Sequence, residues 1–121
     1  MAKLRVRNLS KGTTLADRAD IADTSKKRKT GLLKHTRLEP GEGLWISPCE
    51  AVHTVGMKFP IDVLFLDKKR RVIKIRPEMP RWRFAGALRA HSVLELPSGA
   101  AAGAKTAPGD QLEFERLEET V

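Results

Sequence analysis

The chain has 121 residues, of which 40% are hydrophobic and 31% charged, with a formal net charge of +8. This length predicts one domain, residues 1–121, large enough to bury a core, and this composition excludes an intrinsically disordered protein. No apolar run approaches the ~18 residues of a membrane span, and no signal peptide is recognisable. The single cysteine allows no internal disulfide. We therefore expect a cytoplasmic protein without a membrane span.

Positive charge is concentrated in two segments, 1–37 and 68–89, each with a net charge of +8. Segments 38–67 and 90–121 each carry a net charge of −4. This alternation either stabilises the fold through attraction between its parts or builds a basic surface for an anionic partner. A solvated charged surface with no further role is the simplest interpretation.

The first third of the chain predicts two strands and one helix. Residues 3–9 alternate apolar and polar side chains, which is the period of a half-buried strand. Residues 13–22 fit either a strand or a helix, and we assign them to a second strand. Residues 23–33 predict a short helix, capped by Asp23 or Thr24 and stopped by Gly31.

The centre of the chain is the segment 49–67, which holds the only cysteine and the longest apolar run. Residues 44–46 predict a short strand before it. Residues 61–67 begin after a proline and are apolar except at Asp62 and the last position, so they predict a strand buried on both faces. After a charged turn, residues 71–76 return as the next strand.

The last third predicts two further strands. Residues 77–90 contain two prolines and a glycine and are assigned to a connecting arm. Residues 91–96 and 111–117 are the strands, and 98–105 form a small helical turn capped by the serine at its start. The tail after them is expected to fray. The sequence thus predicts a mainly β (α+β) fold, a compact barrel-like antiparallel sheet with one or two short helices.

Several short motifs resemble a known family. In chain order they are Arg28…Gly31-Leu32, Gly43-Leu44, Pro48-Cys49, Val52-His53-Thr54, Met57, Pro60-Ile61-Asp62-Val63, Phe65-Leu66-Asp67 and Val93-Leu94-Glu95-Leu96-Pro97. Over residues 4–115 the chain resembles the DUF192 family of small bacterial and archaeal proteins, a family without an assigned biochemical activity. The resemblance implies a compact, mainly β, barrel-like domain and supplies no catalytic mechanism.

Cys49 and His53 are four residues apart and can meet on a helix face or across a turn. A neighbouring imidazole can lower the pKa of a thiol and activate it as a nucleophile. Catalysis would also need an oxyanion site and an orienting group, for which Asp62 or Glu95 are candidates. In the alternative interpretation Cys49 packs as a small hydrophobe and His53 bonds to the backbone.

The same region offers ligands for a metal. Cysteine, histidine and methionine together suit a soft metal such as copper, whereas the paired ligands of structural zinc sites are missing. We therefore predict no metal and no cofactor. We predict instead a pocket formed by Cys49, His53, Met57 and Asp62.

Asp62 and Glu95 are carboxylates in apolar strand sequences. Burying an unpaired carboxylate costs several kcal/mol, on the order of 2–5, so each needs a partner or a function. We predict that Arg28 pairs with Asp62 or Glu95 and fixes the helix onto the sheet. The functional alternative is a carboxylate that binds a ligand at the mouth of a pocket.

Basic and aromatic side chains alternate at Arg81, Trp82 and Arg83, and together with Arg70 and Arg71 of the basic turn 68–71 they make a candidate basic surface. Such surfaces bind single-stranded nucleic acid by stacking and phosphate contacts. The chain has only six aromatic residues and no tyrosine, however, and the core needs most of them.

No glycine-rich phosphate loop, zinc-protease motif or nucleophile elbow is present in the sequence. We therefore expect a non-enzymatic module that binds a ligand or partner, either in the pocket near Cys49 or on the arm around Trp82. One alternative is a small enzyme or metal-binding protein that uses Cys49 and His53. Another is a nucleic-acid binder. In either case we expect a monomer or a weak dimer.

Overall fold

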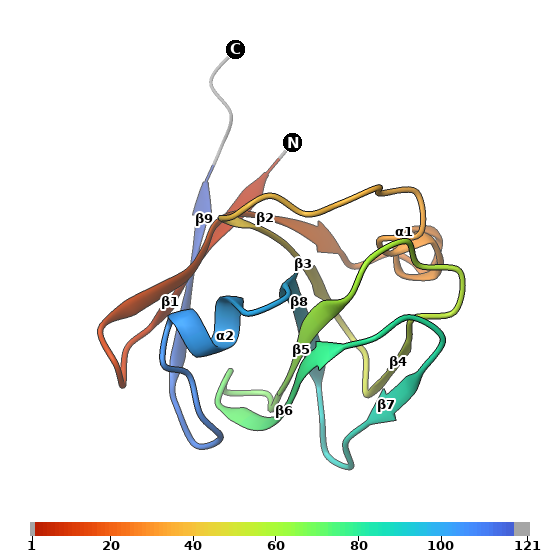
Figure 1. Cartoon of the computed structure of the whole chain (residues 1–121). Helices are drawn as coiled ribbons and strands as arrows, with labels where there is room; N and C mark the ends of the chain where they lie inside the picture. The colour runs from red at the N-terminus through yellow and green to blue at the C-terminus, as the bar shows by residue number, and fades with distance from the viewer. Residues whose placement is uncertain (1, 118–121) are drawn as a thin grey trace.

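The computed structural model of the protein describes residues 2–117, so the tail that was predicted to fray lies outside the described residues. The described chain folds into short strands and two small helices (Figure 1). Their bounds are β1 Lys3–Asn8, β2 Thr13–Ala22, α1 Ser25–Thr30, β3 Glu42–Ile46, β4 Ala51–His53, β5 Ile61–Leu66, β6 Val72–Met79, β7 Phe84–Gly86, β8 Ser92–Pro97, α2 Ala100–Gly103 and β9 Leu112–Leu117.

Most of the strands form one curved seven-stranded sheet with the order β6-β5-β8-β3-β2-β1-β9, and β4 and β7 form a separate antiparallel ribbon. Neighbours in the sheet are antiparallel except β2 and β3, which run parallel. This parallel pair requires a crossover, and α1 with the long loop after it provides the chain length. The predicted mainly β fold is confirmed, but the sheet is mixed rather than antiparallel throughout.

The sheet is not closed into a barrel. Within residues 2–117, the outer strands β6 and β9 approach each other at one isolated bridge, between Arg71 and Gln111. Helix α2 lies on the concave side of the curved sheet, while α1 and the β4–β7 ribbon lie on the other side (Figure 1). The predicted barrel-like curvature is therefore present without closure.

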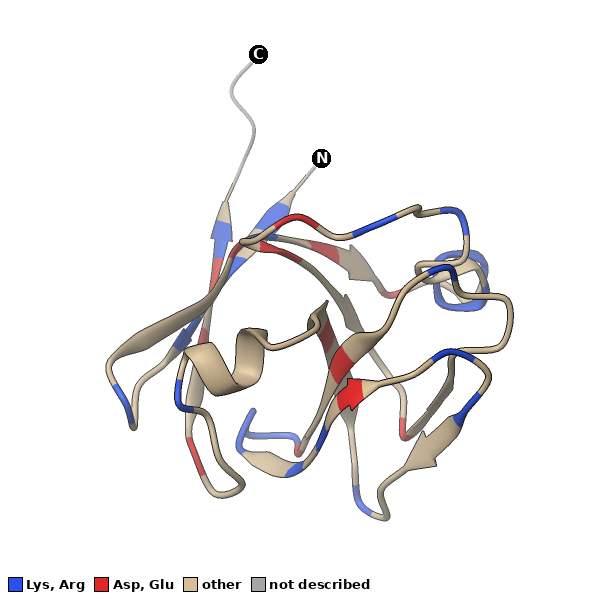
Figure 2. Cartoon of the chain, in the orientation of Figure 1, with Lys and Arg blue, Asp and Glu red and all other residues tan. Residues whose placement is uncertain are grey.

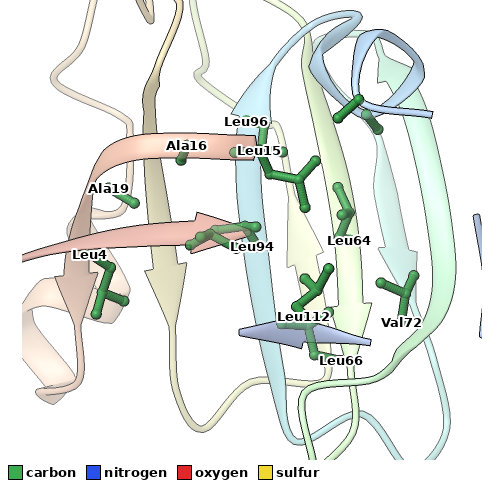
Figure 3. Close-up of a cluster of buried hydrophobic side chains, with 13 residues drawn as sticks. Leu4, Leu15, Ala16, Ala19, Leu64, Leu66, Val72, Leu94, Leu96 and Leu112 are labelled. Atoms are coloured by element: carbon green, nitrogen blue, oxygen red, sulfur yellow. The ribbon is translucent and has the colours of Figure 1, made fainter. Parts of the chain in front are cut away.

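Strand β5 separates two hydrophobic cores, and all six of its residues are buried, as the apolar run predicted. Leu64 and Leu66 belong to a cluster with side chains from β1, β2, β8, β9 and α2 (Figure 3). Val63 and Phe65 belong to a second cluster, which the β4–β7 ribbon and the segment after α1 cover. Each large side chain buried in this way contributes about 1.5–3 kcal/mol relative to its exposed state.

The segment 77–90, predicted as a connecting arm, contains the end of β6 and the whole of β7. Strand β6 continues past the predicted end and includes Pro77. A proline is tolerated there because β6 is an outer strand of the sheet, so its missing N–H removes no bond to a neighbour. The arm also contains β7, which pairs with the unpredicted β4 through Ala51 and Gly86.

The predicted cap of α2 is wrong. Its N-cap is Gly99, in the left-handed region with φ 91°, and no side chain of the cap residue bonds to the helix, so Ser98 does not cap it. Instead, Asp62 of strand β5 caps the helix, because its carboxylate accepts hydrogen bonds from the N–H groups of Gly99 and Ala101. A carboxylate from a distant strand thus replaces a local cap.

Ion pairs join segments of opposite charge, as one interpretation of the charge pattern expected. Lys3 pairs with Asp20, Arg5 with Glu115 and Lys11 with Asp110. The last two pairs join the basic first segment to the acidic last one. Figure 2 shows further basic residues along α1, in the turn between β5 and β6, and in the arm after β6. No helix among residues 2–117 is both long enough and apolar enough to cross a membrane.

Candidate functional site

A pocket of about 320 Å³ lies between α1 and the segment around β4, over the second core. This volume is at the lower end of those that hold small molecules. Its lining brings together residues that the sequence had singled out for different reasons, namely Arg28, Cys49, His53, Met57 and Glu95. Three of the four predicted pocket residues therefore line one cavity, and the fourth, Asp62, does not.

Helix α1 places the basic side of the pocket. Its N-cap is Thr24, whose hydroxyl accepts the N–H of Lys27 at 3.2 Å, and Gly31 ends it with φ 48°. Both boundaries agree with the prediction from the sequence. The helix presents Arg28 and Lys29 to the pocket, Arg28 half-buried and Lys29 exposed.

Glu95 forms part of the buried floor of the pocket. It lies on β8 directly between Leu44 of β3 and Val63 of β5, so its side chain shares their face of the sheet. The residue is only 5% exposed, and among residues 2–117 no hydrogen bond or ion pair reaches its carboxyl group. Burial raises the pKa of Glu95 to about 7. A buried carboxyl group with a raised pKa and no partner is more typical of a functional site than of a hydrophobic core.

Cys49 is not arranged as an activated nucleophile. Its Sγ is half-buried and lies 3.2 Å from the carbonyl oxygen of Ala51, to which it donates. Burial raises the pKa of the Cys49 thiol, and the nearby Glu95 raises it further. The His53 ring instead packs 6.0 Å from the ring of Phe84, centroid to centroid.

Asp62 serves the fold and lies away from the pocket. Its carboxylate accepts three backbone N–H groups, from Glu78 at 2.7 Å, Gly99 at 3.1 Å and Ala101 at 2.8 Å. It is fully buried, yet each of its oxygens is bonded. These bonds join β5 to β6 and to α2.

The predicted ion pair of Arg28 with Asp62 or Glu95 is not formed. Arg28 donates to three neutral oxygens, the carbonyls of Asp23 at 3.2 Å and Ser47 at 3.5 Å and the Ser25 hydroxyl at 3.4 Å. Asp62 does not need the pairing, because backbone N–H groups already satisfy it. Glu95 shares the pocket with Arg28 and remains without a charged partner.

The candidate basic surface is divided between two places. Arg70 packs over the ring of Phe114 at 4.4 Å from its centroid, and Arg71 forms the bridge between the outer strands. Arg81, Trp82 and Arg83 follow the opposite end of β6, whose eight residues span roughly 25 Å. Trp82 is 60% exposed, so the arm rather than the turn offers an aromatic surface.

Sequence reasoning missed two polar residues that hold loops in place. Thr54 is buried, and its hydroxyl donates to the carbonyl of Pro80 at 2.6 Å and accepts the N–H of Arg83 at 2.9 Å. Asp110 bonds to Lys11 and Asn8. Thr54 lies in one of the motifs that resemble the family, which was its only signal. No group of three His, Cys, Asp or Glu side chains within 2–117 could hold a metal ion.

Comparisons with known proteins agree with this fold. The model of the family DUF192, described as "Uncharacterized ACR, COG1430", matches residues 6–114. A UPF0127 protein of Thermococcus sibiricus (strain DSM 12597 / MM 739) is 33% identical over 124 residues, covering 93% of this chain and 75% of that protein.

Two solved structures show the likeness in fold. One is a protein of unknown function from Novosphingobium aromaticivorans DSM 12444, with a TM-score of 0.79 and 26% identity over 92% of this chain and 83% of that one. The other, from Sinorhizobium meliloti 1021, is described as a "putative transcription regulator" and has a TM-score of 0.82 and 21% identity over 94% of each chain. The second likeness concerns the fold alone. From the match over residues 6–114 and the archaeal relative, the chain belongs to the DUF192 family.

Proposed function

We propose that the protein is a non-enzymatic binding module and that the pocket between α1 and β4 binds a small molecule. The observation that carries this proposal is the carboxyl group of Glu95, which is buried at the floor of the pocket without a partner. Burial leaves this carboxyl group poorly solvated, which raises the pKa of Glu95 to about 7. A ligand that bonds to Glu95 would supply the polar partner that the described residues do not provide.

The rim of the pocket supports the same proposal. Arg28 and Lys29 have no acidic partner among the described residues, and His53 is exposed beside them. Ile46 and Met57 are buried apolar parts of the lining. An apolar cavity with a few convergent polar groups is the usual form of a small-molecule site.

The two alternatives, a thiol enzyme and a nucleic-acid binder, can be tested separately. A thiol enzyme needs a reactive Cys49, and the raised pKa of this thiol argues against it. A nucleic-acid binder would use the arm with Trp82, and its binding to a labelled oligonucleotide would weaken steeply with salt. A cytoplasmic location and a monomeric or weakly dimeric state also remain part of the proposal, and the free cysteine supports the location.

The direct test fills the pocket. Ala51 is exposed and lines the cavity, so Ala51→Trp should occupy it without disturbing the core. Amide resonances are followed by two-dimensional NMR while a panel of amino acids, carboxylic acids, amines and sugar phosphates is added. We expect at least one compound to shift resonances of the pocket residues, and we expect Ala51→Trp to abolish these shifts. Ala102→Trp, an exposed site on α2 outside the pocket, should preserve them.

Two results would refute the proposal. One is a panel in which no compound shifts the pocket resonances. The other is a set of shifts that persists unchanged when Ala51→Trp fills the cavity.

A further inference from the structure

We infer that the ligand of this pocket is a small zwitterion, with an ammonium group bound by Glu95 and an acidic group bound by Arg28 and Lys29. This inference rests on the proposed function of the pocket and adds the chemical class of its ligand. It concerns opposite charges that line one cavity and form no ion pair with each other or with any other described residue.

The floor of the pocket selects for a cation. The Glu95 side chain lies among apolar neighbours, Leu44 and Val63, and no described side chain donates to it. An ionised carboxylate is an acceptor only, and it bonds most strongly to a charged donor such as an ammonium group. An anionic ligand would meet repulsion there, and an apolar ligand would leave the carboxyl group unsatisfied.

The rim of the pocket selects for an anion. Arg28 uses its guanidinium on three neutral oxygens at 3.2–3.5 Å, which are long bonds for this group. Lys29, the next residue of α1, also lines the pocket and is exposed. The planar fork of an arginine matches a carboxylate or a phosphate, whereas a ligand with only positive charge would be repelled.

Part of the cavity wall is apolar. Leu32, Leu33, Ile46, Val52 and Met57 form it, and the volume of about 320 Å³ suits a molecule the size of a medium amino acid. The acidic group of the ligand can be a carboxylate or a phosphate, since Arg28 and Lys29 would accept both. The experiment separates these sources.

The pairing also predicts how binding depends on pH. Besides Arg28 and Lys29, the titratable groups facing Glu95 are Cys49 and His53 of the pocket lining, and the exposed Arg76 of β6 lies across β5 in the same row. An ammonium group binds the ionised form of Glu95. Because the pKa of Glu95 is about 7, its ionised fraction rises about tenfold between pH 6 and pH 8.

The test uses the full chain and three zwitterions, each with two counterparts that carry charge of only one sign. L-leucine is compared with isoamylamine and 4-methylpentanoate, 6-aminohexanoate with hexylamine and hexanoate, and phosphoethanolamine with ethylamine and ethyl phosphate. Dissociation constants come from NMR titrations at pH 8. We expect at least one zwitterion to bind at least tenfold more tightly than both of its counterparts, and the identity of that zwitterion tells carboxylate from phosphate.

Three variants locate the two charges. Glu95→Gln and Arg28→Gln should each weaken the zwitterion at least tenfold, while Lys26→Gln, an exposed residue of α1 outside the pocket, should not. The affinity of the wild-type protein should increase up to about tenfold from pH 6 to pH 8, and that of Glu95→Gln should stay constant.

Failure of this inference differs from failure of the proposed function. If a counterpart with charge of only one sign binds as tightly as its zwitterion, or if Glu95→Gln binds normally, the ligand class is wrong while the pocket still binds. If none of the three zwitterions binds, the ligand class is also wrong, and the broader panel with Ala51→Trp decides the proposed function.

Discussion

A single buried acid, Glu95, couples the stability of the protein to pH. Its ordinary pKa is 4.5 and burial raises the pKa to about 7. The folded state therefore holds a proton that the unfolded chain releases between these values. The stability from this group is fully present below pH ~4.5 and is lost as the pH rises through about 7.

Glu95→Gln should remove this pH dependence. Since each pKa unit corresponds to about 1.4 kcal/mol, the wild-type protein should lose about 3 kcal/mol from this group by pH 8, and the variant should not. Urea unfolding at pH 5 and pH 8 measures the difference. Glu50→Gln, on an exposed residue nearby, should follow the wild type. Parallel pH profiles for wild type and Glu95→Gln would show that the carboxyl group is solvated.

The second prediction for a single side chain concerns the reactivity of the Cys49 thiol. Burial, followed by the nearby Glu95, raises the pKa of its thiol, and the thiol donates to the Ala51 carbonyl. Alkylation at pH 7 should therefore be slower than that of a small free thiol, and His53→Ala should leave its rate unchanged. Iodoacetamide labelling followed by mass spectrometry measures both rates. Fast labelling that slows in His53→Ala would favour the thiol enzyme instead.

At the scale of elements, one carboxylate fixes the position of helix α2. Asp62 accepts N–H groups from β6 and from the start of α2, and the helix has no cap of its own. Asp62→Asn keeps the shape but provides one acceptor oxygen in place of two and removes the charge. We expect a loss of about 2–4 kcal/mol in the free energy of unfolding, measured by urea denaturation.

The location of this loss can be checked separately. Hydrogen exchange at the Ala101 amide should accelerate in Asp62→Asn more than exchange in β1 or β9. Asp23→Asn, on an exposed residue before α1, should change the stability by less than about 0.5 kcal/mol. An Asp62→Asn protein as stable as the wild type would mean that the three backbone bonds contribute little.

Elements that depend on local chemistry could be predicted from the sequence. Helix α1 has its cap and its stop directly beside it in the sequence, at Thr24 and Gly31, and β5 is an apolar run that only Asp62 interrupts. The strands β4 and β7 were missed because three residues are too few to reveal an alternation of apolar and polar side chains. The cap of α2 was assigned to Ser98 because its real partner is 37–39 residues away in sequence.

At the scale of the whole molecule, the sheet order depends on pairings that no short pattern encodes. The strand order and the parallel β2–β3 pair bring Glu95 beneath α1, so the pocket could be predicted only in part. Its cysteine, histidine and methionine are close in sequence, which is why the sequence could group three residues that line one cavity. Glu95 belonged to the predicted ion pair, and Asp62 was placed in the pocket because alternation does not tell which face of a doubly buried strand a side chain occupies.

One polar cluster joins the β1–β2 turn to the segment before β9, and its contribution to stability should depend on pH. The carboxylate of Asp110, which precedes β9, accepts bonds from Asn8 Nδ2 at 2.9 Å, Lys11 Nζ at 2.8 Å and the Ala107 N–H at 3.0 Å. The bond from Lys11, followed by that from Asn8, lowers the pKa of Asp110 to about 2. The stabilisation is therefore present above pH ~4 and is lost as the pH falls through about 2.

Asp110→Asn should consequently lower the melting temperature at pH 7 by roughly 5–10 °C, and the difference should shrink toward zero near pH 2. Lys11→Met keeps the bonds from Asn8 and Ala107, so it should cause a smaller loss at pH 7. Calorimetric melting curves between pH 2 and pH 7 measure both variants. Because this cluster joins the β1–β2 turn to the segment before β9, a pH-independent difference would mean that packing of the turns, rather than the charge of Asp110, holds this end of the sheet together.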